Sequence, residues 1–474
     1  MSNLSREKSW IKEVRNSLNI VNPTTELQKW NKNSIYRVPA CIKDLNSKAY
    51  KPQLVSFGPF HHREPQLMPM EEHKHRALLH FLKRTKQPLE HFVAAVEEVV
   101  VQLQESYQNL DERWIKDRDG FVQLMIVDGC FMLEIMCKST NISFHFETTG
   151  HRSSADDYVH NDPIFSAHGM LYTVPYIKRD MLMIENQLPL LVLERLIATA
   201  GMSKKSIHLQ LSIKVFFFIY FTMQTDENIN RLVLKFLAPN LIARPFIGLS
   251  LHPLDLYRKT LLIGPQDSLP DYKPDPNSSE IIRSAMELYE AGIRFKQSRT
   301  TSLHDIHFKH GVLRLPVIVV DDLTEYMFLN LMAFERLHVG AGNDVTSYVF
   351  FMDNIIDSAK DVSLLTTKGI IQNAVGSDKA VAKLFNSLSK DVVLEPDSNL
   401  DKVQRMVNVY CQKQWNMWRA NLLHTYFRSP WAFLSLAAAI FLLVMTVMQT
   451  VYTVLQYYEG NSSPSAPPAA PSPQ

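Results

Sequence analysis

The sequence has few cysteines, and they stand far apart. Only four occur in 474 residues, and no two of them form a CxxC pair. A disulfide framework needs more cysteines at closer spacing, so none is expected, and the chain fits a reducing compartment. The four are Cys41, Cys130, Cys137 and Cys411.

The signatures of common enzyme classes are also missing. The chain has no GxxxxGK phosphate loop, no GxSxG nucleophile elbow, and neither HRD nor DFG. Gly340-Ala-Gly342 is a GxG pattern without a third glycine, and it indicates nothing alone. The formal net charge is only +2, so we expect no nucleic-acid partner.

One long apolar run is present near the end of the chain. Residues 431–452 read WAFLSLAAAIFLLVMTVMQTVY, which is 22 residues without a charge. A helix of that length spans about 33 Å, enough to cross a bilayer core. Trp431 and Tyr452 bound the run, where aromatic residues favour the headgroup level. A core helix is the alternative, but core helices seldom lack a charged face over this length. We predict a transmembrane helix over 429–454, with the lipid bilayer as partner.

The charges beside this run predict its orientation. Lys413, Arg419 and Arg428 precede the run with no acidic residue among them, and Glu459 is the one charge that follows it. Because basic flanks stay on the cytoplasmic side, we expect the large N-terminal part in the cytosol. Charged residues interrupt residues 1–33, so we expect no signal peptide there. We therefore expect the span to insert after synthesis.

Periodic apolar residues predict a mainly α fold (α+β with a small minor sheet), followed by the one C-terminal transmembrane helix. Pro69 with two acids after it marks a helix start, and Ser377 caps a helix with apolar residues at i, i+3, i+4 and i+7. The predicted helices cover residues 69–82, 89–140, 281–293, 323–336, 348–358, 377–388 and 403–427. The predicted strands lie near 54–57, 142–147 and 312–320, the last broken by Pro316.

Composition divides the chain into four parts. Residues 1–34 are polar and mixed in charge, which predicts a mobile arm with one short helix over 10–18. Residues 35–428 form the main domain. The Pro/Asp/Ser-rich stretch 264–280 is a candidate linker within it, so one domain and two domains both stay open. After the span at 429–454, the Ser/Pro/Ala-rich residues 455–474 predict a disordered tail.

Histidines and acids cluster early in the main domain. The group comprises His61, His62, His73, His75 and His80, with Glu72 beside them. Zinc needs three or four ligands converging at about 2.0–2.2 Å, and neither HExxH nor Cys/His alternation is present. His73 and His80 lie two helical turns apart, too far to chelate a metal alone, and we expect His75 to pair with Glu72 or Glu71 instead. We favour structural hydrogen bonding over a metal site.

Glu185, Asn186 and Gln187 stand inside a strongly apolar segment, residues 181–193. Buried polar groups must find partners, so an acid with two amides is a candidate ligand site. The structural alternative is that these side chains cap a helix beginning near Pro189 and tie together backbone groups of neighbouring segments. We favour this alternative.

Asp128 and Cys130 lie in another apolar helical stretch. A Cys–His hydrolase would need a thiol of lowered pKa and an oriented base. Cysteine in such a stretch is usually a small, inert hydrophobe, and we favour that interpretation.

Separated blocks of the sequence, in a fixed order, carry a resemblance to a known family. They include IYRVP at 35–39, YKPQLVSFGPFHH at 50–62, VDGCFMLEI at 127–135, MLMIENQLPLLVLERL at 181–196 and SPWAFLSLAAAIFLLVMTVMQTVY at 429–452. Over residues 35–452 the chain resembles the plant family known as "domain of unknown function 247". Phe57 and Phe60 stand where the family is expected to have Ile and Tyr, which are conservative changes.

The resemblance implies a plant protein with one C-terminal membrane helix, and it supplies no activity and no catalytic residues. Some grass members are implicated as pollen-side determinants of self-incompatibility, which implies work in recognition. The family and the length of the span together imply the plasma membrane.

Two functions of different classes follow. The first is a membrane-anchored protein-interaction or recognition module without catalytic activity, whose loops at 148–163 and 265–280 tune the choice of a protein partner. The alternative is a membrane-associated enzyme of unrecognised class, a hydrolase or transferase that uses the His61–His80 region and Glu185. We expect the first, with no cofactor and no metal.

Overall fold

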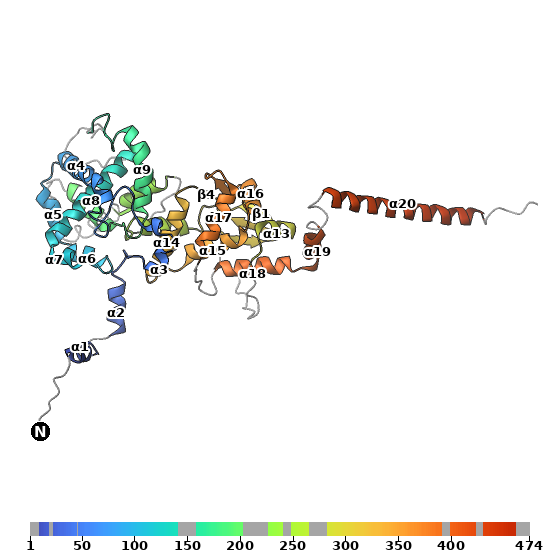
Figure 1. Cartoon of the computed structure of the whole chain (residues 1–474), viewed down its shortest axis with the longest axis horizontal. Helices are drawn as coiled ribbons and strands as arrows, with labels where there is room; N and C mark the ends of the chain where they lie inside the picture. Colours follow the sequence, from blue (N-terminus) through green and yellow to red (C-terminus); the bar gives the residue numbers. More distant parts are fainter. Residues whose placement is uncertain are drawn as a thin grey trace, which may run out of the picture.

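Helices make up most of the described chain, with a few short strands (Figure 1). The computed structural model describes residues 9–18, 22–44, 46–140, 158–201, 226–239, 248–264, 282–390, 399–422 and 430–460. The predicted fold class, mainly α with a small minor sheet, is confirmed. The buried apolar side chains form two cores, and we call the parts around them the N-terminal lobe and the C-terminal lobe.

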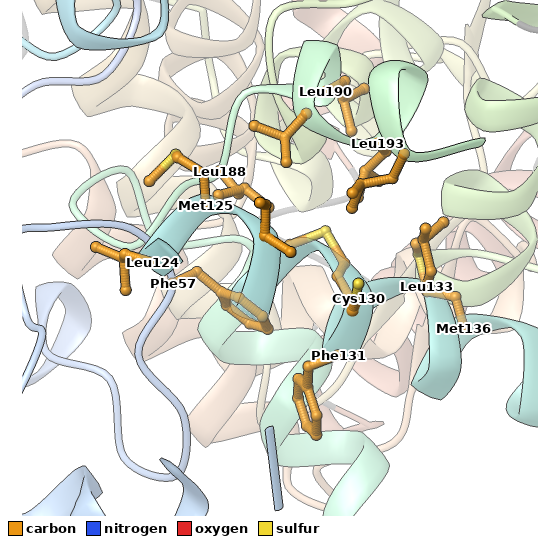
Figure 2. Packing of buried hydrophobic residues seen from close by; sticks show 14 of the residues in the cluster. Phe57, Leu124, Met125, Cys130, Phe131, Leu133, Met136, Leu188, Leu190 and Leu193 are labelled. Atoms are coloured by element: carbon orange, nitrogen blue, oxygen red, sulfur yellow. The ribbon is translucent and has the colours of Figure 1, made fainter. Parts of the chain in front are cut away.

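The N-terminal lobe is built around one helix, α8 (Arg118–Thr140). Among the helices that pack against it are α4 (Met68–Thr85), α5 (Leu89–Glu97) and α10 (Leu190–Gly201). Figure 2 shows side chains of α8, Cys130 and Phe131 among them, in one cluster with Phe57, Leu188 and Leu193. The remaining elements of this lobe are η2 (Pro65–Leu67), α6 (Val100–Glu105), α7 (Glu112–Lys116), α9 (Ala167–Met181) and the helical residues 226–237.

Helix α8 is long and apolar enough to cross a membrane, yet 78% of its apolar window is buried inside the protein. A helix that is apolar on every side belongs either in a core or in a bilayer. Here neighbouring helices cover it, so it is a core helix. The predicted burial of Phe121, Leu124, Met125 and Asp128 is confirmed.

The C-terminal lobe combines helices with two small sheets. Its helices are α12 (Pro253–Leu262), α13 (Ala285–Glu290), α14 (Thr324–Leu337), α15 (Asp344–Ile355), α16 (Ala359–Thr367), α17 (Asp378–Leu388) and α18 (Asn399–Cys411). The Ser377 side chain caps α17 by accepting from the Ala380 N–H at 3.4 Å. Val381, Phe385 and Leu388 are buried, as the periodicity predicts.

Strand β3 (Val312–Leu315) is the centre of a three-stranded sheet. It pairs in parallel with β1 (Arg294–Gln297) and antiparallel with β2 (His307–Lys309). His310 and Gly311, with φ of 51° and 73°, form the two-residue turn between β2 and β3. Pro316 follows β3, and β4 (Ile318–Val320) pairs in parallel with β5 (Ile371–Asn373) instead. The strands predicted at 312–320, interrupted by proline, are confirmed.

A segment from the start of the main domain crosses between the lobes. Ile35 belongs to the N-terminal core and bridges Tyr107 through its backbone. Residues 36–50, with α3 (Ala40–Lys43) and η1 (Ser47–Tyr50), contribute buried side chains to the C-terminal core instead. Asn330 on α14 donates from Nδ2 to the Ala49 carbonyl oxygen at 2.9 Å. We call residues 36–50 the strap.

Helices at both ends extend from the lobes (Figure 1). They are α1 (Ser9–Leu18), which matches the helix predicted over 10–18, α2 (Pro23–Trp30) and α20 (Pro430–Gly460). The apolar window of α20, Leu434–Tyr458, has the length and composition of a membrane span, and none of it is buried. The predicted C-terminal apolar helix is therefore confirmed as a helix of spanning length.

Three predicted elements are wrong in the lobes. The helical region predicted over 89–140 is divided into α5, α6, α7 and α8, and Asn109, in the longest break, has φ 53°. Residues 54–57 form no strand, because side chains and not a neighbouring strand bind their backbone groups. The helix predicted over 281–293 is reduced to α13, because Gly292 leaves the helical region at φ 98°. The buried side of α13 carries Ala285 and Leu288, whereas Tyr289 is 42% exposed.

The helix predicted over 403–427 is interrupted. It breaks after Cys411 into α18 and α19 (Gln414–Leu422), where Asn416 donates from Nδ2 to the Tyr410 carbonyl oxygen at 2.7 Å. The predictions for residues 142–147, 148–157, 265–280 and 455–474 lie outside the described residues, apart from 455–460, which continue α20.

Candidate functional site

Side chains, not a neighbouring strand, hold the backbone of residues 53–58. Asp180 accepts hydrogen bonds from the N–H groups of residues 53, 54 and 55 at 3.1, 2.7 and 3.0 Å. Asn186 accepts from the N–H of Phe57 at 2.8 Å and donates to the Val55 carbonyl at 3.0 Å. Asp128 accepts from the N–H of Gly58 at 2.7 Å. Buried backbone groups must be paired, and here polar side chains from α8 and from residues 180–186 do the pairing.

A buried lysine compensates the charge of Asp128. The Lys74 Nζ atom lies 2.8 Å from Asp128 Oδ1, 2.7 Å from Glu71 Oε1 and 3.0 Å from Ser56 Oγ. Lys74 and Asp128 are both 0% exposed. Burial raises the pKa of Asp128 to about 6, and the positive charge of Lys74 opposes that rise. All three donors of the ammonium have acceptors, which leaves this lysine no free proton for a substrate.

Glu185 connects the strap to the N-terminal lobe. Its carboxylate accepts from the Val38 N–H and lies 2.7 Å from Lys43 Nζ. His61 Nε2 stands 3.6 Å away, beyond hydrogen-bond distance, while His61 Nδ1 lies 2.6 Å from Glu64. Burial raises the pKa of Glu185, but the surrounding His61, Lys43 and Val38 N–H outweigh it and hold that pKa below its usual value.

The side-chain amide of Gln187 also binds backbone groups, through both its nitrogen and its oxygen. Nε2 donates to the carbonyls of Met181 and Met183, each at 2.7 Å, and Oε1 accepts from the Leu254 N–H at 3.1 Å. Its own carbonyl accepts from the Tyr107 hydroxyl at 3.0 Å. Thus residues 185–187 tie distant segments together, as the structural alternative states, but the side-chain bonds that the structure describes for them do not cap α10.

The histidines do not converge. His62 lies edge-on to the Trp114 ring, with centroids 5.4 Å apart, and burial lowers its pKa. His73 pairs with Arg76, which also binds Asp162, and burial followed by the Arg76 charge lowers the pKa of His73. His75 and Glu72 are exposed, and the His80 ring lies against the Tyr158 ring with an interplanar angle of 31°. Among the described residues, no three His, Cys, Asp or Glu side chains are grouped to hold a metal ion.

The thiol considered for catalysis lies in the core. Cys130 is 0% exposed, and burial raises the pKa of its thiol well above the usual value. A protonated thiol without access to solvent is a poor nucleophile. Its surroundings in Figure 2 are the apolar side chains of the N-terminal core.

The same use of polar side chains recurs in the C-terminal lobe. Glu335 accepts from Arg258 at 2.8 Å and from the N–H groups of Val345 and Thr346, each at 2.9 Å. His252 donates from Nε2 to the Ser34 carbonyl at 3.0 Å, which holds the end of the arm against α12. Buried carboxylates and imidazoles therefore act throughout the described protein as partners for backbone.

A cavity of about 230 Å³ lies elsewhere, between the strap and α14. None of the candidate residues borders it. Its lining includes Ile42, Tyr50, Leu329, Met332 and Leu388, with Arg336 and Lys390 among the polar members. The buried candidates Glu185, Asn186 and Gln187 thus belong to packed core and not to this cavity.

Comparison with known proteins places the chain. The family model DUF247, described as plant protein of unknown function, matches residues 35–445. The chain belongs to this family. The resemblance seen in the sequence blocks is confirmed at the level of the family, and the architecture above is that of a DUF247 protein.

Two proteins of Arabidopsis thaliana are similar over nearly the full length. UPF0481 protein At3g47200 is 31% identical over 460 residues, which cover 92% of this chain and 89% of the relative. Putative UPF0481 protein At3g02645 is 25% identical over 528 residues, 94% of each chain. No solved structure matches. Neither name states an activity.

Two residues at the centre of this DUF247 protein are absent from the sequence-based candidates. Lys74 lies between Met70 and Leu78 on the buried face of α4. A charged residue at a position where the periodicity expects an apolar one is a signal that the sequence does contain. Asp180 precedes the apolar segment at 181–193 and has no such signal. Because its partners are backbone groups about 125 positions away, no local pattern reveals it.

Proposed function

We propose that this DUF247 protein is a membrane-anchored protein-interaction module, and that the candidate polar cluster is scaffold. The geometry supports the scaffold role because Asp128, Asp180, Asn186 and Gln187 direct their polar atoms at backbone of other segments. A catalytic or ligand-binding site needs convergent polar groups that face a cavity. These groups face the chain itself.

Helix α20 supports the membrane part of the proposal. Its window Leu434–Tyr458 contains no charged residue, and it is fully outside the lobes. An exposed apolar helix of this length is costly in water and favourable in a bilayer. We propose that it anchors the protein, with the lobes in the cytosol because the basic flank precedes the helix, and with the plasma membrane as the location.

One face of α9 is the proposed protein-binding surface. His168, Leu171, Tyr172, Pro175 and Tyr176 recur at i, i+3, i+4, i+7 and i+8, which puts them on one side of the helix. Leu171, Tyr172 and Tyr176 are 68%, 62% and 51% exposed. We call these five residues the α9 face. A surface helix normally turns such a stripe inward, and an exposed apolar patch of this kind marks an interaction site.

The chemistry of the α9 face fits a protein partner. Tyrosine anchors are enriched at binding hot spots because they bury a large ring and keep a polar tip. A helix face with anchors at this spacing fits an apolar groove on the partner. Residues 158–163, the described part of the loop predicted to tune partner choice, are separated by three residues from the start of α9 at Ala167.

Proximity labelling in plant cells tests this proposal. The full chain carries the labelling enzyme at its N-terminus, and an anchor-only fusion of residues 429–474 supplies the background. We expect Leu171→Ser/Tyr172→Ser to lower the labelling of the enriched proteins at least about tenfold, as the loss of two hot-spot side chains implies. The matched control Val101→Ser/Ile115→Ser removes side chains that are 56% and 58% exposed elsewhere in the same lobe, and it should preserve labelling.

Two results would contradict the proposal. One is a set of labelled proteins that does not exceed the anchor-only background. The other is equal loss in the two double variants, which would indicate general damage to the lobe. Protease protection of tags at both ends, on intact protoplasts, checks the orientation: only the C-terminal tag should be cleaved from outside.

A further inference from the structure

Two tryptophans stand exposed on α19, the last described helix before α20. Trp415 is 77% exposed and Trp418 is 70% exposed. They are three positions apart and therefore share one helix face. Asn416, between them, is buried and bonded to the Tyr410 carbonyl, so the fold itself turns the two rings outward. Helix α19 also contacts α13 in the C-terminal lobe.

The chain around this helix is basic. No acidic residue occurs from residue 402 to residue 458, while Lys413 and Arg419 flank the tryptophans and Arg428 follows. Lys413 and Arg419 are exposed. A tryptophan ring favours the boundary between headgroups and acyl chains, and lysine and arginine are attracted to anionic headgroups. Their combination on one short helix fits a lipid surface.

The chain also limits how far α19 can lie from the proposed span. Seven residues, 423–429, separate the end of α19 from the start of α20. Fully extended, this connection reaches at most about 28 Å. With α20 in the bilayer, α19 is therefore held within reach of the headgroups, on whichever side the lobes stand.

We propose that α19 lies in the headgroup region of the membrane and docks the C-terminal lobe onto it. The partner is a bilayer that contains anionic lipid, and Trp415 and Trp418 are the inserted groups. This inference rests on the proposed anchoring by α20 and adds to it: the lobe has a fixed face toward the membrane instead of swinging on a tether.

Quenching of tryptophan fluorescence by brominated lipid tests the docking. The full chain is inserted into vesicles of phosphatidylcholine and phosphatidylserine whose acyl chains carry bromine close to the headgroup. Trp431→Phe is introduced first, because Trp431 borders the span and would report on α20. In this background we expect strong quenching, and adding Trp415→Phe/Trp418→Phe should remove most of it.

The chain supplies a matched control. Trp10 and Trp30 are 59% and 52% exposed on α1 and α2, so Trp10→Phe/Trp30→Phe in the same background should leave the quenching unchanged. If quenching is equal with and without the α19 tryptophans, the docking is refuted. Flotation of the vesicles separates the two proposals: a chain that floats but shows no α19 quenching retains its anchor, whereas a chain that does not float refutes the anchor and the docking together.

Discussion

Replacing Lys74 by methionine tests the central ion pair of the N-terminal lobe. Lys74 and Asp128 are both fully buried, and their charged atoms lie 2.8 Å apart. Methionine preserves the apolar stem but removes the ammonium, which leaves the Asp128 carboxylate in the core without its cation. Removing one partner of a buried pair costs about 3–5 kcal/mol. We expect Lys74→Met to lower the free energy of unfolding by that amount at neutral pH.

The loss should shrink as the pH falls. Burial raises the pKa of Asp128 to about 6 even with Lys74 present, and losing the lysine raises that pKa further. A carboxyl whose folded pKa exceeds its unfolded value binds protons more readily in the folded state, so the folded state gains stability as the pH drops through the folded pKa. The variant gains more from this than the natural protein. The difference between them should therefore be smaller at about pH 5 than at about pH 8.

Urea unfolding of the detergent-solubilised full chain measures both effects. Trp114 is buried in the same lobe beside Phe121, and its fluorescence reports on local unfolding. The matched control is Lys116→Met, whose partner Glu112 lies at 2.6 Å but whose pair is 76% and 80% exposed. The control should cost less than about 1 kcal/mol. The reasoning fails if Lys74→Met costs no more than the control, or if its cost does not change with pH.

Two further predictions concern a histidine and a glycine. Burial lowers the pKa of His252 to about 4. Unfolding then adds a proton, so stability should fall by up to about 3 kcal/mol between pH about 6.5 and about 4, and His252→Asn should flatten this slope in urea titrations. At Gly58, with φ 70°, an added Cβ would lie 2.6 Å from the Tyr107 hydroxyl, whereas at Gly340, with φ 87°, it would meet nothing within 4 Å. Gly340→Ala should cost about 1–2 kcal/mol from backbone strain alone, and Gly58→Ala about 1–3 kcal/mol more; equal melting temperatures of the two variants would contradict the steric argument.

Elements governed by neighbours in the sequence could be predicted from it. The apolar face of α4, the Ser377 cap of α17 and the pair of strands split by Pro316 all follow local rules, and the structure confirms them. The segment at 54–57 has the same apolar character as a strand. Its backbone partners are side chains about 125 positions away, so sequence pattern alone could not distinguish it from one.

In the candidate site, too, local patterns could be predicted from the sequence, whereas contacts between distant residues could not. Proximity in sequence grouped His61, His73 and His75, but a helix turns residues two apart to different sides, so His73 faces Arg76 while His75 faces solvent. The polar side chains that do meet, Lys74 and Asp128, come from helices 54 positions apart. Their contact depends on how α4 packs on α8. The apolar periodicity predicts which face of each helix is buried, but it does not predict which residues of the two helices lie opposite each other.

The strap also sets the order in which the protein can be completed during synthesis. The Ala49 carbonyl cannot form its hydrogen bond until Asn330, 281 positions later in the chain, has been synthesised. At about 5–20 residues per second, that interval lasts roughly a quarter of a minute to a minute. Through it, Tyr36 and Tyr50 have no core to enter, and the nascent chain needs shielding. For the same reason, a chain cut between the lobes should yield halves that are unstable apart and that recover only when both are present together.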